Sequence, residues 1–307
     1  MMTEIEIEFA SEGAVLRGRL VLPSSTTSGK PAVIMAHGTS ATVEMVLIEY
    51  AREFARAGIV AMVYDHRNFG RSGGDARGEI NPWIQCRGYL AALDFACDRP
   101  EIDPSRIALW GDSYTGGQVV AVAACDPRPC AVVAQCPVFG MTLPALQASD
   151  DYISAFKQTL LHGDVAGTPE TTTGPLPVVS FDPSSVASLL EPIQAFRWFI
   201  EYGGRPGSGW KNRVTRVIPP TPVPYMPLLC ASYVRVPTLL MVAPEDEMVH
   251  ANPAVARYAY GLLPAPKRWV DVKDGHFGLL YYPSARFTEV AGIQSAFLLE
   301  HLVNRTD

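Results

Sequence analysis

Three side chains have the types and the order along the chain that acyl transfer requires: a serine, a carboxylate and a histidine. Ser113 follows the apolar run 106–110, Asp246 follows the apolar run 238–243, and His276 follows the apolar run after that. A histidine that is oriented by a carboxylate can take the proton of a serine hydroxyl and make its oxygen a nucleophile. We therefore predict Ser113 as nucleophile, His276 as general base and Asp246 as the residue that orients the base.

The turn around Ser113 departs from the common G-x-S-x-G pattern. Thr115 stands in place of the second glycine, and glycines follow at Gly116 and Gly117. The setting of strand, turn and helix is still the one that such a nucleophile turn needs. We expect the two glycines to let the helix lie close to neighbouring backbone. A serine that only caps the helix is the structural alternative.

A second turn, His37-Gly38-Thr39-Ser40, follows the apolar run 32–36. In a serine hydrolase, backbone N–H groups at these two turns stabilise the oxyanion of the tetrahedral intermediate. The predicted donors are the N–H groups of Thr39 and Tyr114. His37 itself is interpreted as structural.

Other residues compete for the same roles. His250 is the rival base, but it lies only four residues after Asp246 at the entry to a predicted helix. Asp246 is preferred as the carboxylate because its chain order and strand position agree. The competing carboxylates are Glu245, Glu247 and Asp274, and His66 in the glycine-rich stretch 64–74 is a further, less favoured histidine. In that stretch Asp65 and Arg67 are expected to pair with nearby backbone or charge.

Composition excludes several classes of partner. The chain has 307 residues, of which 48% are hydrophobic and 18% charged, with a net charge of -6 and no run of lysines or arginines. Nucleic acid and anionic membranes are therefore not expected partners. The amino terminus lacks the pattern of a signal peptide, so we expect a cytoplasmic protein. The six cysteines contain no C-x-x-C pair and predict no metal or disulfide, and no nucleotide-binding motif is present.

Alternating strand and helix patterns predict an α/β fold with a mostly parallel, doubly wound sheet. The segments 5–9 and 15–22 alternate at period two, which indicates an antiparallel hairpin. Short apolar runs are typical of parallel strands that are buried on both faces. These runs are 32–36, 59–64, 106–110, 131–135 and 238–243. The helices are expected at about 43–57, from Pro82 with Asn81 as N-cap to about Cys97, from Ser113, at 253–263 and at 285–302.

The segment 138–230 interrupts this alternation with amphipathic pieces and proline-rich links. We interpret it as an inserted, mostly helical cap, which leaves 1–137 and 231–307 as the catalytic domain. Its aromatic and methionine content predicts an apolar substrate pocket of medium size, with few charges and no evident anchor for a carboxylate. The predicted pocket residues are Trp198, Trp210, Tyr225 and Met226.

The motifs HGTS, YDHRNFGRSGG, WGDSYTGG, APEDEMV and GHFG give the chain a family resemblance. It resembles the α/β-hydrolase superfamily, and within it the capped dienelactone-hydrolase-like and X-Pro-dipeptidyl-peptidase-like serine hydrolases, including relatives that process polyketides or ring-cleavage products. In those relatives the displaced glycine of the nucleophile turn is a known variant. The resemblance also implies a homodimer that pairs through the cap or the last helix.

The resulting prediction is a hydrolase that cleaves an ester, lactone or thioester of a small molecule through an acyl-enzyme, without metal or organic cofactor. Two alternatives stay open. The same triad can cleave a carbon–carbon bond or pass the acyl group to an acceptor other than water. The fold can also serve as a binding protein without activity.

Overall fold

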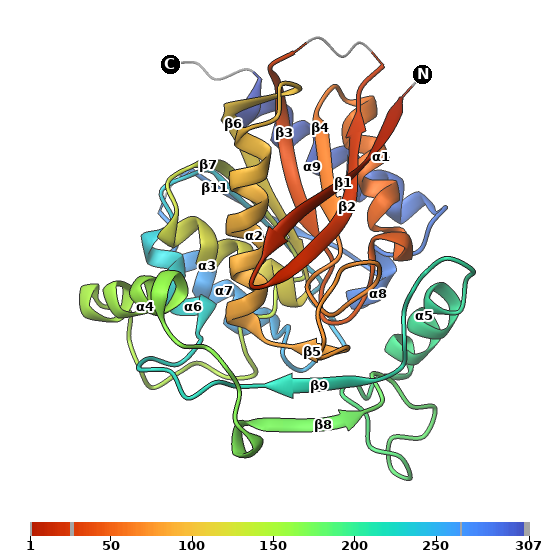
Figure 1. Cartoon of the computed structure of the whole chain (residues 1–307), viewed down its shortest axis with the longest axis vertical. Helices are drawn as coiled ribbons and strands as arrows, with labels where there is room; N and C mark the ends of the chain where they lie inside the picture. The colour runs from red at the N-terminus through yellow and green to blue at the C-terminus, as the bar shows by residue number, and fades with distance from the viewer. Residues whose placement is uncertain (1, 25–27, 265, 304–307) are drawn as a thin grey trace.

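The computed structural model describes residues 2–24, 28–264 and 266–303, and its centre is an 8-stranded sheet in the order β1-β2-β4-β3-β6-β7-β10-β11 (Figure 1). The strands are β1 (Thr3–Ser11), β2 (Ala14–Leu22), β3 (Lys30–Ala36), β4 (Val60–Tyr64), β6 (Ile102–Asp112), β7 (Pro129–Gln135), β10 (Thr238–Val242) and β11 (Lys267–Asp271). β1 pairs with β2, and β2 with β4, in antiparallel fashion, whereas the strands from β4 to β11 pair in parallel. The predicted hairpin and the parallel sheet are both confirmed.

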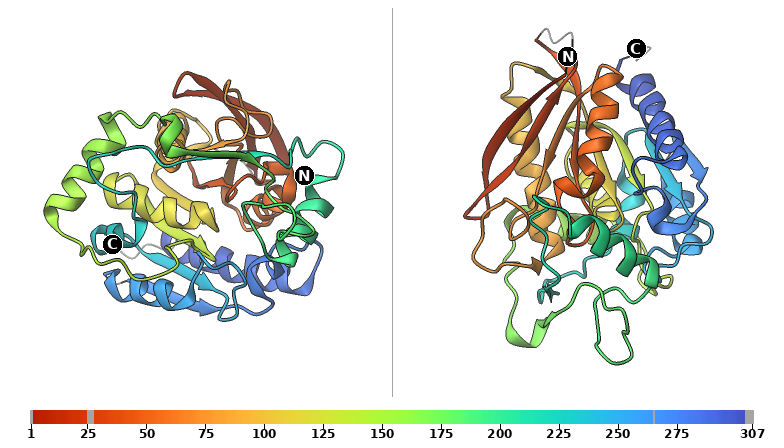
Figure 2. Two further views of the ribbon diagram at one scale, coloured as in Figure 1. Left: turned by 90° about the horizontal axis from the view of Figure 1, so that it is seen from below. Right: turned by 90° about the vertical axis from the view of Figure 1, so that its right-hand side faces the viewer.

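Helices cover both faces of this sheet, as the side view in Figure 2 shows. α1 (Ile48–Arg56) and α9 (Ala285–Leu302) pack on one face, where Phe54 and Phe287 belong to the same buried core as alternate residues of β3 such as Val33. α2 (Pro82–Cys97), α3 (Tyr114–Cys125) and α7 (Pro253–Leu262) pack on the other face. Period-two alternation sends successive strand side chains to opposite cores, which explains why these strands are apolar throughout.

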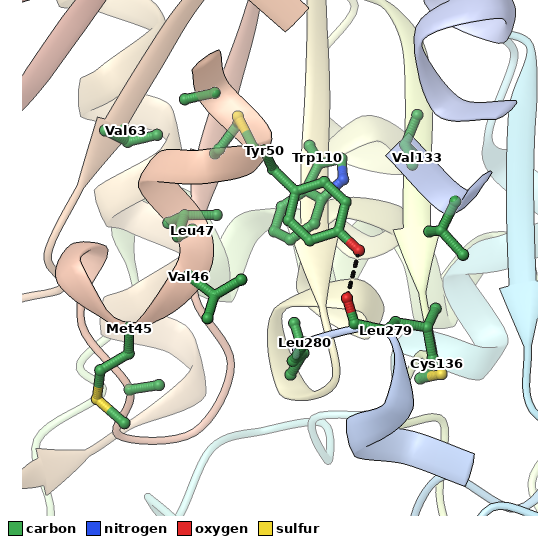
Figure 3. Close-up of a cluster of buried hydrophobic side chains, with 14 of the residues drawn as sticks. Met45, Val46, Leu47, Tyr50, Val63, Trp110, Val133, Cys136, Leu279 and Leu280 are labelled. Carbon is green, nitrogen blue, oxygen red and sulfur yellow. Dashed lines mark hydrogen bonds between the residues drawn. The ribbon is translucent and has the colours of Figure 1, made fainter. Parts of the chain in front are cut away.

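The core beside α1 is closed by a hydrogen bond from a buried tyrosine. The Tyr50 hydroxyl donates to the Leu279 carbonyl over 2.8 Å (Figure 3), and the centroid of its ring lies 5.5 Å from that of Trp110. Burial of a large aromatic ring stabilises the core only if its hydroxyl finds a partner. The bond therefore fixes the chain directly after α8 (Gly275–Gly278), the short helix that contains His276.

The helix predicted for 43–57 is regular only from Ile48. In the segment Val43–Leu47, Met45 and Val46 have non-helical backbone angles, with a φ of 80° at Val46. A β-branched residue in this region is strained. The irregular turn leaves the Met45 carbonyl 3.0 Å from Nε2 of His37, a tertiary contact that sequence periodicity does not reveal.

The inserted segment lies across the carboxyl edge of the parallel strands (Figure 1). It contains α4 (Asp150–His162), β8 (Thr172–Leu176), α5 (Ile193–Gly203), β9 (Val214–Val217) and α6 (Pro227–Cys230). β8 and β9 join β5 (Glu79–Ile80), which precedes this segment in the chain, in a 3-stranded sheet of order β5-β9-β8 that no local sequence pattern predicts. Within the described ranges, no helix is both long and apolar enough to cross a membrane.

Two glycine-to-alanine substitutions test how closely this sheet is packed. A Cβ at Gly18 on β2 would lie 1.9 Å from the Val63 carbonyl oxygen of β4, whereas Gly292 on α9 has no neighbour within 4 Å. We expect Gly18→Ala to lower the free energy of unfolding by about 1–3 kcal/mol and Gly292→Ala to raise it by up to about 1 kcal/mol. Urea denaturation measures both, and equal effects would contradict this packing.

Candidate active site

Ser113 lies in a strained turn between β6 and α3. Its φ of 57° and ψ of −116° fall outside the regions that L-residues favour. Two glycines make the turn possible, because a Cβ at Gly111 would lie 2.2 Å from the Thr115 carbonyl oxygen and one at Gly38 would lie 2.7 Å from the Ser113 Cβ. The strained turn places Ser113 at the carboxyl end of the parallel strands.

Thr115 replaces a glycine of the usual pattern with a hydrogen-bonding residue. Its hydroxyl oxygen lies 2.9 Å from the carbonyl oxygens of Ala36 and Asp112, which share its one hydrogen, and accepts from the Asp112 N–H over 2.9 Å, so it connects the turn to β3. The next glycines make close backbone approaches, since a Cβ at Gly116 would lie 2.9 Å from the Pro137 Cα and one at Gly117 would lie 2.5 Å from the Val138 carbonyl. The expected role of these glycines is confirmed.

The side chains of Ser113, His276 and Asp246 meet although they come from distant parts of the chain. The Ser113 Oγ lies 2.9 Å from His276 Nε2, and His276 Nδ1 lies 2.7 Å from Asp246 Oδ2. The Ser113 side chain makes no capping hydrogen bond to α3. The alternative of a serine that only caps this helix therefore has no support from its contacts.

The loop before His276 is held by a second carboxylate. The His276 N–H donates to Glu247 Oε2 over 2.8 Å, and the neighbouring Gly275 has a φ of 69°. A Cβ at Gly275 would lie 2.3 Å from the same oxygen, so only glycine fits there. Glu247, a competitor for the orienting role at the sequence level, thus contacts the backbone of His276 and not its ring.

Burial and nearby charges set the protonation of the buried groups. Burial alone would lower the pKa of His276, but the charge and hydrogen bond of Asp246, with smaller effects of Asp112 and Glu247, raise it above its ordinary value. Burial raises the pKa of Asp112 to about 6, against the opposing effects of His276 and Gln135. Asp112 is thus a second buried carboxylate that favours the protonated imidazole.

A chain of amides joins Asp112 to the last helix. Gln135 donates to Asp112 Oδ1 over 2.8 Å, Gln294 of α9 donates to Gln135 Oε1 over 2.7 Å, and the Trp110 indole donates to Gln294 Oε1 over 2.8 Å. All these groups are buried. Such a network satisfies a buried carboxylate without a cation.

His37 is a structural residue of the second turn. Its Nδ1 accepts from the Gly38 N–H over 2.9 Å, and its Nε2 faces the Met45 carbonyl over 3.0 Å. Burial lowers its pKa to about 4, so the ring is neutral and its 3.5 Å approach to Asp112 is not an ion pair. The ring holds the turn that carries Thr39, whose φ is 47°.

Two cavities meet at Ser113. The smaller, of about 20 Å³, is lined by residues that include His37, Thr39, Ser113, Trp198 and His276. The larger, of about 80 Å³, has a mostly apolar lining: Thr39, Ile80, Ser113, Tyr114, Val138, Leu189, Leu190, Arg216, Met248 and His250. Both cavities thus combine main-domain residues with residues of the segment 138–230.

The predicted pocket residues lie at different places. Trp198 lines the smaller cavity beside Ser113. Trp210 lines a third cavity together with Ser40, to whose hydroxyl its indole donates over 3.3 Å. Tyr225 packs edge-on against Trp83, and the Met226 carbonyl accepts from Tyr152. Neither Tyr225 nor Met226 lines the cavities beside Ser113, because the segment around them packs against α2 and α4.

The rival histidines are accounted for by their surroundings. His250 is exposed and lines the larger cavity. His66 is buried edge-on against Tyr64 and Tyr89, and both its ring nitrogens lack partners among the described residues. The carboxylate of Asp65 accepts from the N–H groups of Val43 and Arg71 over 2.8 Å, which confirms its expected pairing with backbone.

The only group of side chains in the described ranges with the spacing of a metal site is Cys136, Asp246 and His276, whose ligand atoms lie within 4.8 Å of one another. Burial raises the pKa of the Cys136 thiol, whereas a metal needs the thiolate. Asp246 and His276 Nδ1 are also engaged with each other. These three residues therefore do not fit a metal ion.

Comparisons with known proteins identify relatives in sequence and in fold. A model of the family described as serine aminopeptidase, S33, matches residues 27–171. The α/β hydrolase GrgF from Penicillium sp. sh18 has the same fold, with a TM-score of 0.73 over 98% of this chain and 99% of that chain at 24% identity. The chain has the α/β-hydrolase fold.

The proteins that are similar in sequence include some named thiohydrolases. The thiohydrolase apmlB of Arthrinium phaeospermum is 41% identical over 133 residues, which are 43% of this chain. The match covers 42% of the length of that relative. The thiohydrolase of Eupenicillium brefeldianum is 28% identical over 95% of this chain and 92% of its own length.

Sequence reasoning missed three features of the α/β-hydrolase site: Asp112 beside the serine, Glu247 on the backbone of His276, and Arg216 in the larger cavity. Asp112 precedes Ser113 at the buried end of a strand, where a carboxylate is unusual, and this was the available signal. Nothing in the sequence places Arg216 near the serine, because β9 reaches it only through pairing with β5.

Asp112→Asn tests the electrostatic role of Asp112 directly. The substitution retains an acceptor for Gln135 but removes a negative charge that favours the protonated imidazole, so the pKa of His276 should fall. An NMR titration of the His276 ring measures it. Asp271→Asn, the same change at an exposed site on β11, is the control. An unchanged pKa in Asp112→Asn, or equal shifts in both variants, would contradict this role.

Proposed function

We propose that this chain is a serine hydrolase that cleaves an ester, thioester or lactone through an acyl-enzyme on Ser113. The observation that carries the proposal is the continuous hydrogen-bonded line of 2.9 Å and 2.7 Å from the Ser113 Oγ through His276 to Asp246. Nucleophile, base and orienting carboxylate need this geometry for acyl transfer.

In the first step, His276 Nε2 takes the Ser113 proton as the serine oxygen attacks the substrate carbonyl carbon. Asp246 keeps the proton on Nδ1 and stabilises the imidazolium that forms. His276 then gives the proton from Nε2 to the leaving oxygen or sulfur, and the acyl group remains on Ser113. A water molecule, deprotonated by His276 in turn, releases the acid.

We assign the stabilisation of the tetrahedral oxyanion to the N–H groups of Thr39 and Tyr114. Both residues line the cavity that contains Ser113, and Tyr114 is the first residue of α3, where N–H groups lack helical partners. A donor of this kind typically contributes about 3 kcal/mol to the transition state. The strained φ of 47° at Thr39 supports a fixed position for its N–H.

The proposed substrate class follows from the larger cavity and from the relatives. The lining is mostly apolar and suits an alkyl or aromatic acyl group of medium size. The relatives named thiohydrolases favour a thioester among the possible bonds. We propose the segment 138–230 as the lid of this pocket, because Leu189, Leu190 and Trp198 approach Ser113 from it.

Ser113→Ala, His276→Ala and Asp246→Asn test the proposal. Residues of a triad act as a unit, so each change should lower kcat/KM for p-nitrophenyl esters and acyl thioesters by several orders of magnitude. Ser113→Ala should also lose the single adduct that a fluorophosphonate forms, as intact mass shows. Product analysis with and without an added alcohol acceptor separates hydrolysis from acyl transfer.

His250→Ala provides the matched control, since this histidine lines the larger cavity beside Ser113 but makes no hydrogen bond to a carboxylate among the described residues. It should retain fluorophosphonate labelling. Full labelling of folded His276→Ala with loss of labelling in His250→Ala would falsify the assignment of the base. Labelling of Ser113→Ala at the wild-type rate would reject the nucleophile.

We also propose that the chain forms a homodimer and is located in the cytoplasm. In analytical ultracentrifugation, a homodimer would have twice the chain mass of 33.3 kDa.

A further inference from the structure

One residue in the larger cavity does not fit a purely apolar substrate. Arg216 is an exposed residue of β9 and lines the cavity together with Ser113 and Tyr114. Of the described residues in that lining, it alone carries a permanent charge. The apolar part of the lining includes Ile80, Leu189 and Leu190.

The small sheet directs this arginine toward the cavity. β5 and β9 pair in parallel with Ile80 opposite Arg216, and paired residues of neighbouring strands present their side chains on the same face. Ile80 is buried and lines the same cavity, so this face of β9 is turned toward Ser113. Figure 1 shows β9 beside β5, below the carboxyl edge of the main sheet.

Among the described residues, the guanidinium of Arg216 has no anionic partner. Within residues 2–24, 28–264 and 266–303 it makes neither an ion pair nor a hydrogen bond, and no carboxylate lines the cavity. Burial and the charge of Arg216 lower the pKa of His250, so this neighbour adds no positive charge at neutral pH. An unpaired arginine beside an apolar wall favours a ligand that brings its own anion.

The position of His276 decides which part of the substrate occupies this cavity. The leaving group takes its proton from His276 Nε2 and therefore departs on the side of that ring. His276 lines the smaller cavity but is not part of the lining of the larger one, which extends on the side of Tyr114. We therefore place the acyl part of the substrate in the larger cavity.

We propose that Arg216 is a specificity-determining residue that binds a carboxylate on the acyl part of the substrate. The substrates are then esters or thioesters of apolar acids that carry a second, ionised carboxyl group at the far end of the acyl chain. This inference rests on the proposed serine hydrolase function. Two parallel N–H groups of the guanidinium match the two oxygens of a carboxylate, which a neutral acyl chain cannot offer.

The test compares substrates that differ only in charge. p-Nitrophenyl half-esters of adipic, pimelic, suberic and azelaic acid are assayed beside the same compounds with the far carboxyl group methylated. We expect the wild type to prefer at least one free carboxylate over its methyl ester on the order of tenfold in kcat/KM, and Arg216→Gln to lose that preference while it retains activity on the methyl esters. High salt should weaken the preference.

Arg213→Gln is the matched control, because it removes the same charge three residues away in a different cavity. The preference should survive in Arg213→Gln. The proposal is overturned if the wild type shows no preference at any chain length, or if both variants lose it equally. It is also overturned if Arg216 selects only for a carboxylate placed on the leaving phenol.

Failure of the underlying function gives a different result. If Ser113→Ala hydrolyses charged and neutral esters like the wild type, the serine mechanism is wrong whatever Arg216 does. If Ser113→Ala is inactive and the wild type hydrolyses charged and neutral substrates equally, the serine mechanism stands and only the proposed role of Arg216 is rejected.

Discussion

The arrangement at the carboxyl edge of the sheet depends on the strained backbone of Ser113. A non-glycine residue at a φ of 57° and ψ of −116° costs on the order of 1–3 kcal/mol and persists only when its surroundings leave it no other conformation. Gly38 and Gly111 leave room for the turn, and the Thr115 hydroxyl bonds both β3 and β6. Because Ser113 is fixed in this way, the loops that carry Asp246 and His276 have a defined position against which to place these side chains.

Next to Ser113, the buried carboxylate of Asp112 is hydrogen-bonded by an amide side chain and not by a cation. Asp112 is 1% exposed, and Gln135 bonds its carboxylate where an arginine or lysine would be the common partner. A cation at that position would oppose the protonated imidazole of His276, whereas an amide leaves the negative charge of Asp112 to favour it. The chain continues through Gln294 to Trp110, so α9 and the end of β6 are held in register with the site by hydrogen bonds as well as by apolar packing.

The inserted segment supplies the walls that the main sheet lacks. An open parallel sheet offers a reactive edge but no enclosure, and α5 with the sheet β5-β9-β8 closes it from below. The enclosure is uneven in character. α5 brings Trp198 and Phe199 to the smaller cavity, while β9 brings a guanidinium to the larger one. The two cavities beside Ser113 therefore differ in the chemistry of their walls.

The sequence by itself determined the sheet, the helices that cover it and the order Ser113, Asp246, His276, because apolar runs and caps such as Asn81 are local signals. It did not determine the turn at Val46, the strands of the inserted segment or the place of Arg216. β5 has only two residues, and β8 contains Gly174 and Pro175, so neither reads as a strand without its partner. Only the tertiary structure decided which side chains surround Ser113, since pairing between strands more than a hundred residues apart is set by burial across the whole fold and not by any local pattern.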